Sequence, residues 1–179
     1  MPRKDTPPPG SLIGAYIAPC DYVDCYSISL DGRPDLQNCA PYAFAEHFGT
    51  VEFGWSNALI ALRDALVAPL GLKTTGQLRA EGGGKAPHEK GPGDRVNFFR
   101  LYALEADEVL LGEDDRHQDF RLSVHRTRGA AAKVVMTTCC KRHNGFGYVY
   151  LALILPIHKQ LVKATLKKAI ALPLRMPET

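Results

Sequence analysis

The chain has 179 residues, of which 45% are hydrophobic and 23% charged, and its formal net charge is +3. This length suits a single domain with one core. The composition shows neither the low hydropathy of a disordered chain nor the apolar excess of a membrane protein. A net charge this small does not indicate nucleic acid, and we expect none as a partner.

The first 20 residues are expected to form a disordered or extended segment, because Pro7, Pro8 and Pro9 oppose a helix. This stretch also lacks the apolar run that a secretory signal needs, so export is not expected. The five cysteines form an odd set without a C-x-x-C pair, which is typical of reduced cytosolic thiols. A redox or metal role for the adjacent Cys139 and Cys140 is the alternative. We therefore predict a cytoplasmic protein.

Alternating β-branched and aromatic residues predict a first strand over residues 22–30, closed by a turn at Asp31-Gly32. Two short helices are expected next. The first covers Ala40 to Phe48, and the second covers Asn57 to Gly71, where leucines recur at helical spacing.

Residues 73–94 contain six glycines and two prolines and are expected to be mostly loop, most clearly over residues 80–94. The triple glycine at 82–84 is followed by no Lys-Ser or Lys-Thr pair and by no helix. It therefore does not indicate a phosphate-binding loop.

From Arg95 onward the pattern predicts four strands, and their short connections favour an antiparallel meander. The strands are expected at residues 95–106, 108–113, 117–127 and 132–143. In the third strand, alternation separates a polar face from an apolar face formed by Phe120, Leu122 and Val124. The polar face holds His117, Asp119, Arg121, Ser123 and His125. The fourth strand is expected to be central or covered on both faces.

The last element is a long amphipathic helix that begins after Asn144, an acceptable N-cap, and runs to Leu172. Lys159, Lys163 and Lys167 are spaced by four on the side opposite its apolar residues. Pro156 predicts a kink. The apolar stretch at 146–157 is shorter than the roughly 20 residues that cross a bilayer, so a core or interfacial helix is expected. Residues 173–179 form a tail.

Two strings, GEDDRHQDFRLSVHR at 112–126 and HNGFGYVYLALILPIHKQLVKATLKKA at 143–169, resemble an uncharacterised bacterial family of unknown function. Members of that family occur alone or fused behind short-chain-dehydrogenase-like domains. The resemblance covers Asp21 to Ala171, and its most specific parts are LGEDDRHxDFR and the P-x-H at residues 156–158. It supplies no catalytic residue.

The order of strand, two short helices, antiparallel strands and long C-terminal helix also resembles the helix-grip, or START-like, architecture. In that fold a curved sheet wraps the long helix and often encloses an apolar cavity. We therefore expect an α+β fold with a single START-like domain over residues 21–172. One more strand is expected around residues 73–79 or in the glycine-rich stretch.

The leading functional hypothesis is an apolar or amphipathic small molecule bound between the sheet and the long helix. The alternative is a cyclase, hydratase or isomerase that uses a His-Asp pair, with His117 and Asp119 as the catalytic candidates. His117, Asp119 and His143 could also form a two-His-one-carboxylate metal site, but our prediction is that the protein has no metal and no other cofactor. The ligand-binding candidates are Arg100, Tyr102, Asp115, Arg121, His143 and His158.

The charge distribution leaves a third hypothesis open. No Asp or Glu occurs from Phe120 to Pro177, and this stretch holds eleven of the 22 Lys and Arg. Either it packs against the acidic first part of the chain, or it forms a basic face for an anionic membrane surface or partner. In the second case the domain is an interaction module. The sequence carries no signal for the oligomeric state.

Overall fold

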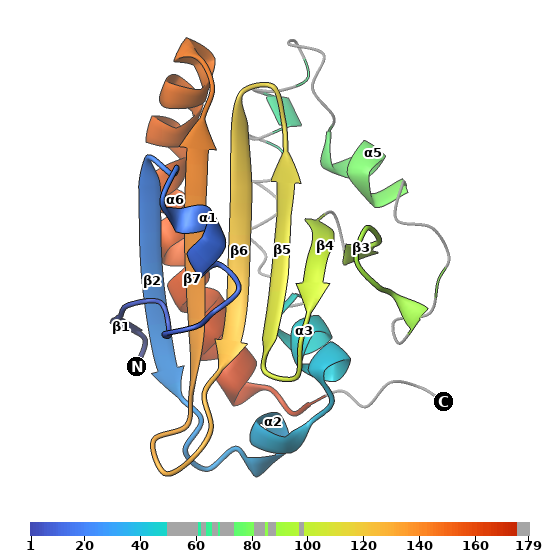
Figure 1. Ribbon diagram of the computed structural model, residues 1–179, viewed down its shortest axis with the longest axis vertical. Helices are drawn as coiled ribbons and strands as arrows, with labels where there is room; N and C mark the ends of the chain where they lie inside the picture. The colour runs from blue at the N-terminus through green and yellow to red at the C-terminus, as the bar shows by residue number, and fades with distance from the viewer. Residues whose placement is uncertain are drawn as a thin grey trace.

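The structure is a computed structural model that describes residues 1–49, 61, 64–65, 68, 74–80, 85, 89–96 and 99–174. Its centre is a seven-stranded sheet in the order β1-β2-β7-β6-β5-β4-β3, in which every neighbouring pair is antiparallel (Figure 1). The strands are β1 (Arg3–Lys4), β2 (Tyr22–Ser29), β3 (Arg95–Val96), β4 (Phe99–Leu104), β5 (Glu108–Asp114), β6 (Gln118–Arg126) and β7 (Lys133–Arg142). The predicted α+β class and the antiparallel meander are confirmed.

Helices lie on both faces of this sheet. The long C-terminal helix α6 (Gly145–Ala171) covers one face, and the short α1 (Gly14–Ile17) lies on the other (Figure 1). The remaining described helices are α2 (Pro34–Asn38), α3 (Pro41–Gly49) and α5 (Thr75–Ala80). Helix α3 confirms the predicted helix from Ala40 to Phe48, whereas α2 was not predicted. The predicted helix from Asn57 to Gly71 lies largely outside the described residues.

Strand β7 is an interior strand of the sheet, because it pairs with β2 on one side and with β6 on the other. Its residues 134–140 are all buried, which confirms that both of its faces are covered. The α6-facing side of β2 and β7 packs against the second half of α6 through Val162, Leu166 and Ala169. The main core therefore lies beneath the C-terminal half of α6.

Asn144 caps α6, as the sequence predicts. Its Oδ1 accepts a hydrogen bond from the Gly147 backbone N–H at 3.0 Å, and its Nδ2 donates to the Arg116 carbonyl at 2.9 Å. The cap therefore ties the start of α6 to the β5–β6 turn. The helix is continuous through Pro156 to Ala171.

Within the described part of the chain, α6 is the one helix long and apolar enough to cross a membrane by length and composition. A core helix of a soluble protein meets the same test. Seven of its residues are buried against the rest of the chain, in two groups near its start and in its second half: Gly147, Tyr150, Leu151, Val162, Thr165, Leu166 and Ala169.

The first 20 residues pack across the sheet. Strand β1 pairs with β2, and α1 places Ile13, which is fully buried, on the face opposite α6. The buried carboxylate of Glu108 accepts hydrogen bonds from the backbone N–H of Leu12 and Ile13 and from the Ser123 hydroxyl. The segment expected to be disordered or extended thus forms a strand at β1 and a short helix at α1, and Glu108 holds it to the sheet.

Two other expectations are corrected. The additional strand is not found around residues 73–79, because Thr75–Ala80 form helix α5. Its alternative place, the glycine-rich stretch, lies largely outside the described residues. The sheet instead gains β1 at one edge and β3 at the other. The long strand expected at 95–106 is two strands, β3 and β4, that pair with each other as a hairpin.

Ion pairs inside the fold account for much of the charge asymmetry. Among the described residues, five basic side chains of the carboxylate-free stretch pair with acids that precede it: Arg121–Asp114, Arg126–Asp107, Arg128–Asp107, Lys133–Asp5 and Arg142–Asp21. On α6, the Lys159 and Lys163 ammonium groups lie 5.7 and 4.9 Å from the ring centroids of Tyr22 and Tyr26. Compensation between the two parts of the chain is therefore built into the sheet.

A candidate binding cavity between the sheet and helix α6

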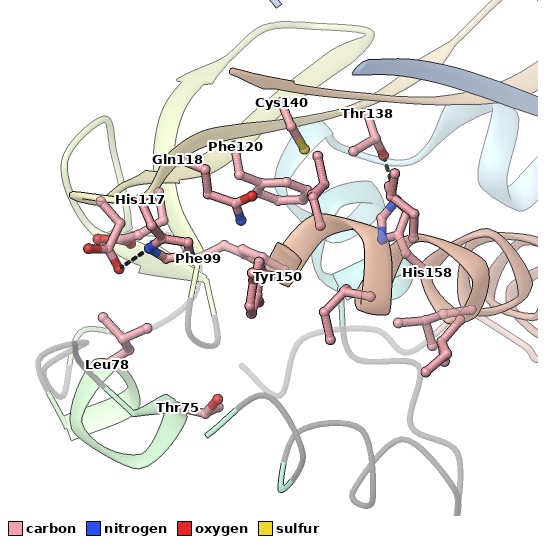
Figure 2. A pocket seen from close by; sticks show the side chains of 17 residues that line it. Thr75, Leu78, Phe99, His117, Gln118, Phe120, Thr138, Cys140, Tyr150 and His158 are labelled. Carbon is pink, nitrogen blue, oxygen red and sulfur yellow. Dashed lines mark hydrogen bonds and ion pairs between the residues drawn. The ribbon is translucent and has the colours of Figure 1, made fainter. Parts of the chain in front are cut away.

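A cavity of about 200 Å³ lies between the α6-facing side of the sheet and the first half of α6 (Figure 2). Helix α5 borders it on the side away from the sheet. The residues that line it are Thr75, Leu78, Phe99, Glu113, Asp115, His117, Gln118, Phe120, Thr138, Cys140, Tyr150, Leu151, Ile154, Leu155, Ile157, His158 and Leu161.

The helix supplies most of the apolar wall. Leu151, Ile154, Leu155 and Ile157 line the cavity from consecutive turns, whereas Val162 and the turns that follow pack in the main core. The apolar first half of α6 thus borders a hollow instead of a filled core. The first half of α6 therefore lines a cavity and the second half packs in the core, a difference that the apolar pattern of the sequence alone does not reveal.

The sheet side of the cavity is formed by alternate residues of β6 and β7. Phe120 stacks on Phe99 with ring centroids 5.6 Å apart, and Thr138 and Cys140 follow on the neighbouring strand (Figure 2). Burial raises the pKa of the Cys140 thiol to about 12. The thiol is therefore protonated at neutral pH and is a poor nucleophile.

His158 joins the helix to this sheet wall. Its Nε2 and the Thr138 Oγ1 are 3.1 Å apart and form a hydrogen bond (Figure 2). Burial lowers the pKa of the imidazole below its ordinary value of 6.5. The neutral ring is therefore the form that fits this wall at neutral pH.

The lowered pKa of His158 predicts a pH dependence of stability. Below about pH 6.5 the unfolded chain binds a proton at residue 158 that the folded protein takes up only at lower pH. We expect the free energy of unfolding to fall as the pH drops from 7 to 5, with this histidine contributing at most about 1.4 kcal/mol per pH unit. His158→Gln should flatten that slope in denaturant titrations at pH 5, 6 and 7. An unchanged slope in the variant would contradict the assignment.

Polar side chains gather at the end of the cavity near the β5–β6 turn. His117 is 4% exposed, and its ring centroid lies 4.9 Å from that of Tyr150 and 5.4 Å from that of Phe146. The His117 Nδ1 lies 3.5 Å from the Asp115 Oδ2. Glu113 borders the same end and is held by the buried Arg95, whose Nη2 donates to Oε1 at 3.1 Å.

Gln118 completes this polar end of the cavity. It is 9% exposed and points from the first position of β6 into the cavity (Figure 2). In the described part of the structure, its Oε1 is buried without a hydrogen-bond partner. An unpaired buried acceptor is costly, so a hydrogen-bond donor placed there would be stabilised.

Three of the eight residues predicted from the sequence line the cavity: Asp115, His117 and His158. The predicted juxtaposition of His117 and Asp119 on one strand face is not observed. Strand β6 begins at Gln118, so His117 lies in the preceding turn and its side chain turns toward α6. The imidazole faces Asp115 instead.

Asp119 and His143 pair with each other at the rim of the sheet. The distance between the Asp119 Oδ1 and the His143 Nε2 is 2.8 Å, and both side chains are about one-third exposed. His117 contributes to the cavity instead. Among the described residues no group of three His, Cys, Asp or Glu side chains is arranged to hold a metal ion.

The other three predicted residues, Arg100, Tyr102 and Arg121, are not in the cavity wall. The Arg121 guanidinium lies 3.8 Å from the centroid of the Tyr102 ring, and its Nη1 donates to Asp114 Oδ1 at 2.6 Å. Tyr102 packs with the cluster beneath α1, on the sheet face opposite α6. Arg100 is exposed. The even positions of β4 thus face away from the helix, and Phe99 supplies the contact with the cavity.

The cavity residues absent from the sequence-based candidates are mainly Gln118, Thr138, Cys140 and Tyr150. Strand alternation could have identified Gln118, because it lies on the same face as Phe120, Leu122 and Val124 and is the polar residue at the start of that face. Thr138 and Cys140 share a face of the neighbouring strand. Their convergence depends on the β6–β7 register, which pairs Phe120 with Cys140.

Comparisons with known proteins identify a family and no characterised relative. No curated protein and no solved structure matches the chain significantly. A family model described as "Protein of unknown function (DUF2867)" matches residues 16–165, which span β2 to β7 and most of α6. The chain therefore belongs to this family of proteins of unknown function, DUF2867.

Proposed function

We propose that the protein binds an apolar or amphipathic small molecule in the cavity between the sheet and α6. The observation that carries the proposal is the cavity itself, which is walled by apolar side chains and ends at a buried polar cluster. Binding sites for small molecules combine these two features. The arrangement of sheet and helix also agrees with a START-like domain. The five free cysteines suit a reducing compartment such as the cytoplasm.

A fluorescence titration with the neutral, apolar probe N-phenyl-1-naphthylamine tests the proposal. We expect saturable binding by the unchanged protein. Leu155→Trp should raise the dissociation constant at least tenfold, because the indole would take up much of a space of about 200 Å³. The matched control is Leu153→Trp on the same helix, since Leu153 is 52% exposed and is not a cavity residue.

The control variant should bind the probe within about twofold of the unchanged protein. Equal loss of affinity in the two variants would place the probe outside the cavity. Absence of saturable binding to the unchanged protein would contradict the proposed function.

The pairing of His117 with Asp115 favours a second candidate function, an acid-base enzyme of the cyclase, hydratase or isomerase type. A carboxylate beside a buried imidazole can orient it and tune its proton affinity. Both side chains border the cavity, as a proton-transfer pair acting on a bound molecule must.

Deuterium exchange tests this second candidate. A molecule extracted from the purified protein is identified by mass spectrometry and incubated with the protein in deuterated water. An enzyme that abstracts a carbon-bound proton should introduce deuterium into that molecule, and His117→Asn should remove the effect. If the unchanged protein introduces no deuterium, proton abstraction is not its reaction.

A further inference from the structure

Two carboxylates, those of Glu113 and Asp115, border the polar end of the cavity beside the Gln118 amide and the His117 imidazole. Gln118 Oε1 is buried and, among the described residues, has no partner. The Asp115 and Glu113 carboxylates border the same end, and an ionised carboxylate can only accept. The Gln118 side chain lies on the cavity side of the sheet (Figure 2), and Tyr150 lines the same cavity.

The charges at this end have the same sign as an anionic head group. Arg95 pairs with Glu113, whereas the contact given for the Asp115 carboxylate is with the His117 imidazole at 3.5 Å. Among the described residues that line the cavity there is no Lys or Arg. A carboxylate or phosphate entering here would face repulsion and an unpaired acceptor.

We infer that this end receives a hydrogen-bond-donating head group, a hydroxyl or an ammonium, on a ligand whose apolar body lies along α6. The inference rests on the proposed function, because it specifies the ligand class for the same cavity. The head group donates to Gln118 Oε1, and the Asp115 carboxylate lies at the same end of the cavity to accept a second hydrogen bond or to stabilise a positive charge. The apolar body contacts Leu151, Ile154 and Leu155.

Competition experiments test this ligand class. Four competitors with unbranched alkyl chains are tested for displacement of N-phenyl-1-naphthylamine from the protein at pH 7: 1-decanol, decylamine, decanoate and decyl methyl ether. Their apolar bodies are matched, and only the first two donate a hydrogen bond. We expect decanol and decylamine to bind at least tenfold more tightly than decanoate and the ether. Preference for decanol over decylamine, or the reverse, identifies which of the two donors the site takes.

Gln118→Leu locates the recognition at a single residue. Removing the acceptor should weaken decanol about tenfold and leave the ether unchanged, because the ether makes no hydrogen bond to this oxygen. The matched control is Gln160→Leu, an exposed position on α6, which should change neither. Direct binding of the fluorescent probe to each variant verifies that the cavity is intact.

The outcomes separate the two proposals. If the probe binds and Leu155→Trp prevents it, but the ether or decanoate binds as tightly as decanol, the inferred ligand class is wrong and the cavity function stands. Unchanged decanol affinity in Gln118→Leu also overturns the inference. If the unchanged protein does not bind the probe, the proposed function itself fails.

Discussion

Replacing Arg126 with methionine is expected to destabilise the folded protein by about 3–5 kcal/mol. This side chain is 1% exposed, and its guanidinium donates to the carbonyl oxygens of Leu36, Cys39 and Ala106. Its Nε also donates to Asp107 at 3.0 Å. Methionine retains most of the apolar volume but leaves these acceptors without their donor.

A neighbouring arginine provides the matched control. Arg128 binds the same Asp107 carboxylate through its Nε and Nη2, yet its side chain is 53% exposed. Exposed ion pairs contribute little, so Arg128→Met should cost no more than about 1 kcal/mol. Chemical denaturation of both variants measures the difference. Equal losses would show that the buried carbonyl contacts of Arg126 do not stabilise the fold.

The importance of Arg126 illustrates what the sequence does not reveal. Periodicity predicts β2, β5, β6, β7 and α6, because each element exposes and buries residues at its own repeat. The Asn144 cap is also predictable, since it depends on residues three positions apart. By contrast, Arg126 bonds to carbonyls about 90 positions earlier in the chain, and no local pattern encodes that contact.

Short elements that depend on tertiary contacts are also missing from the sequence prediction. Helix α1 has four residues and no side-chain cap of its own. Its position comes from the Glu108 carboxylate on β5, which binds the backbone N–H groups of Leu12 and Ile13. Helix α5 lies in a stretch whose glycines predict loop. Neither element is stable by local propensity alone.

Strand alternation predicted only part of the candidate site. Five residues of the string from 113 to 121, which contains the predicted pair His117 and Asp119, line the cavity: Glu113, Asp115, His117, Gln118 and Phe120. Alternation then failed at its first residue, since His117 precedes the strand and its side chain follows the geometry of the turn. The rule holds from Gln118 onward. Because the strand was predicted to begin one residue too early, the imidazole was paired with Asp119 in the prediction, whereas in the structure it faces Asp115.

Gly147→Ala is expected both to destabilise the fold and to disturb the polar end of the cavity. An alanine Cβ at this position would overlap the carbonyl oxygen of His117, which is backbone and has little freedom to move. Overpacking of this kind costs about 1–3 kcal/mol. The gain in helix propensity from glycine to alanine is about 1 kcal/mol, so steric overlap should prevail.

Gly145→Ala separates the steric effect from helix propensity. Gly145 begins the same helix, and a Cβ there would meet nothing within 4 Å, so this variant should be neutral or slightly stabilised. Thermal unfolding and probe titration of both variants provide the test. Because Asn144 binds both Gly147 and the turn before His117, displacing the helix start should also move the imidazole and weaken binding of decanol. Retention of full stability and affinity in Gly147→Ala would show that the helix start and the turn are not in close contact.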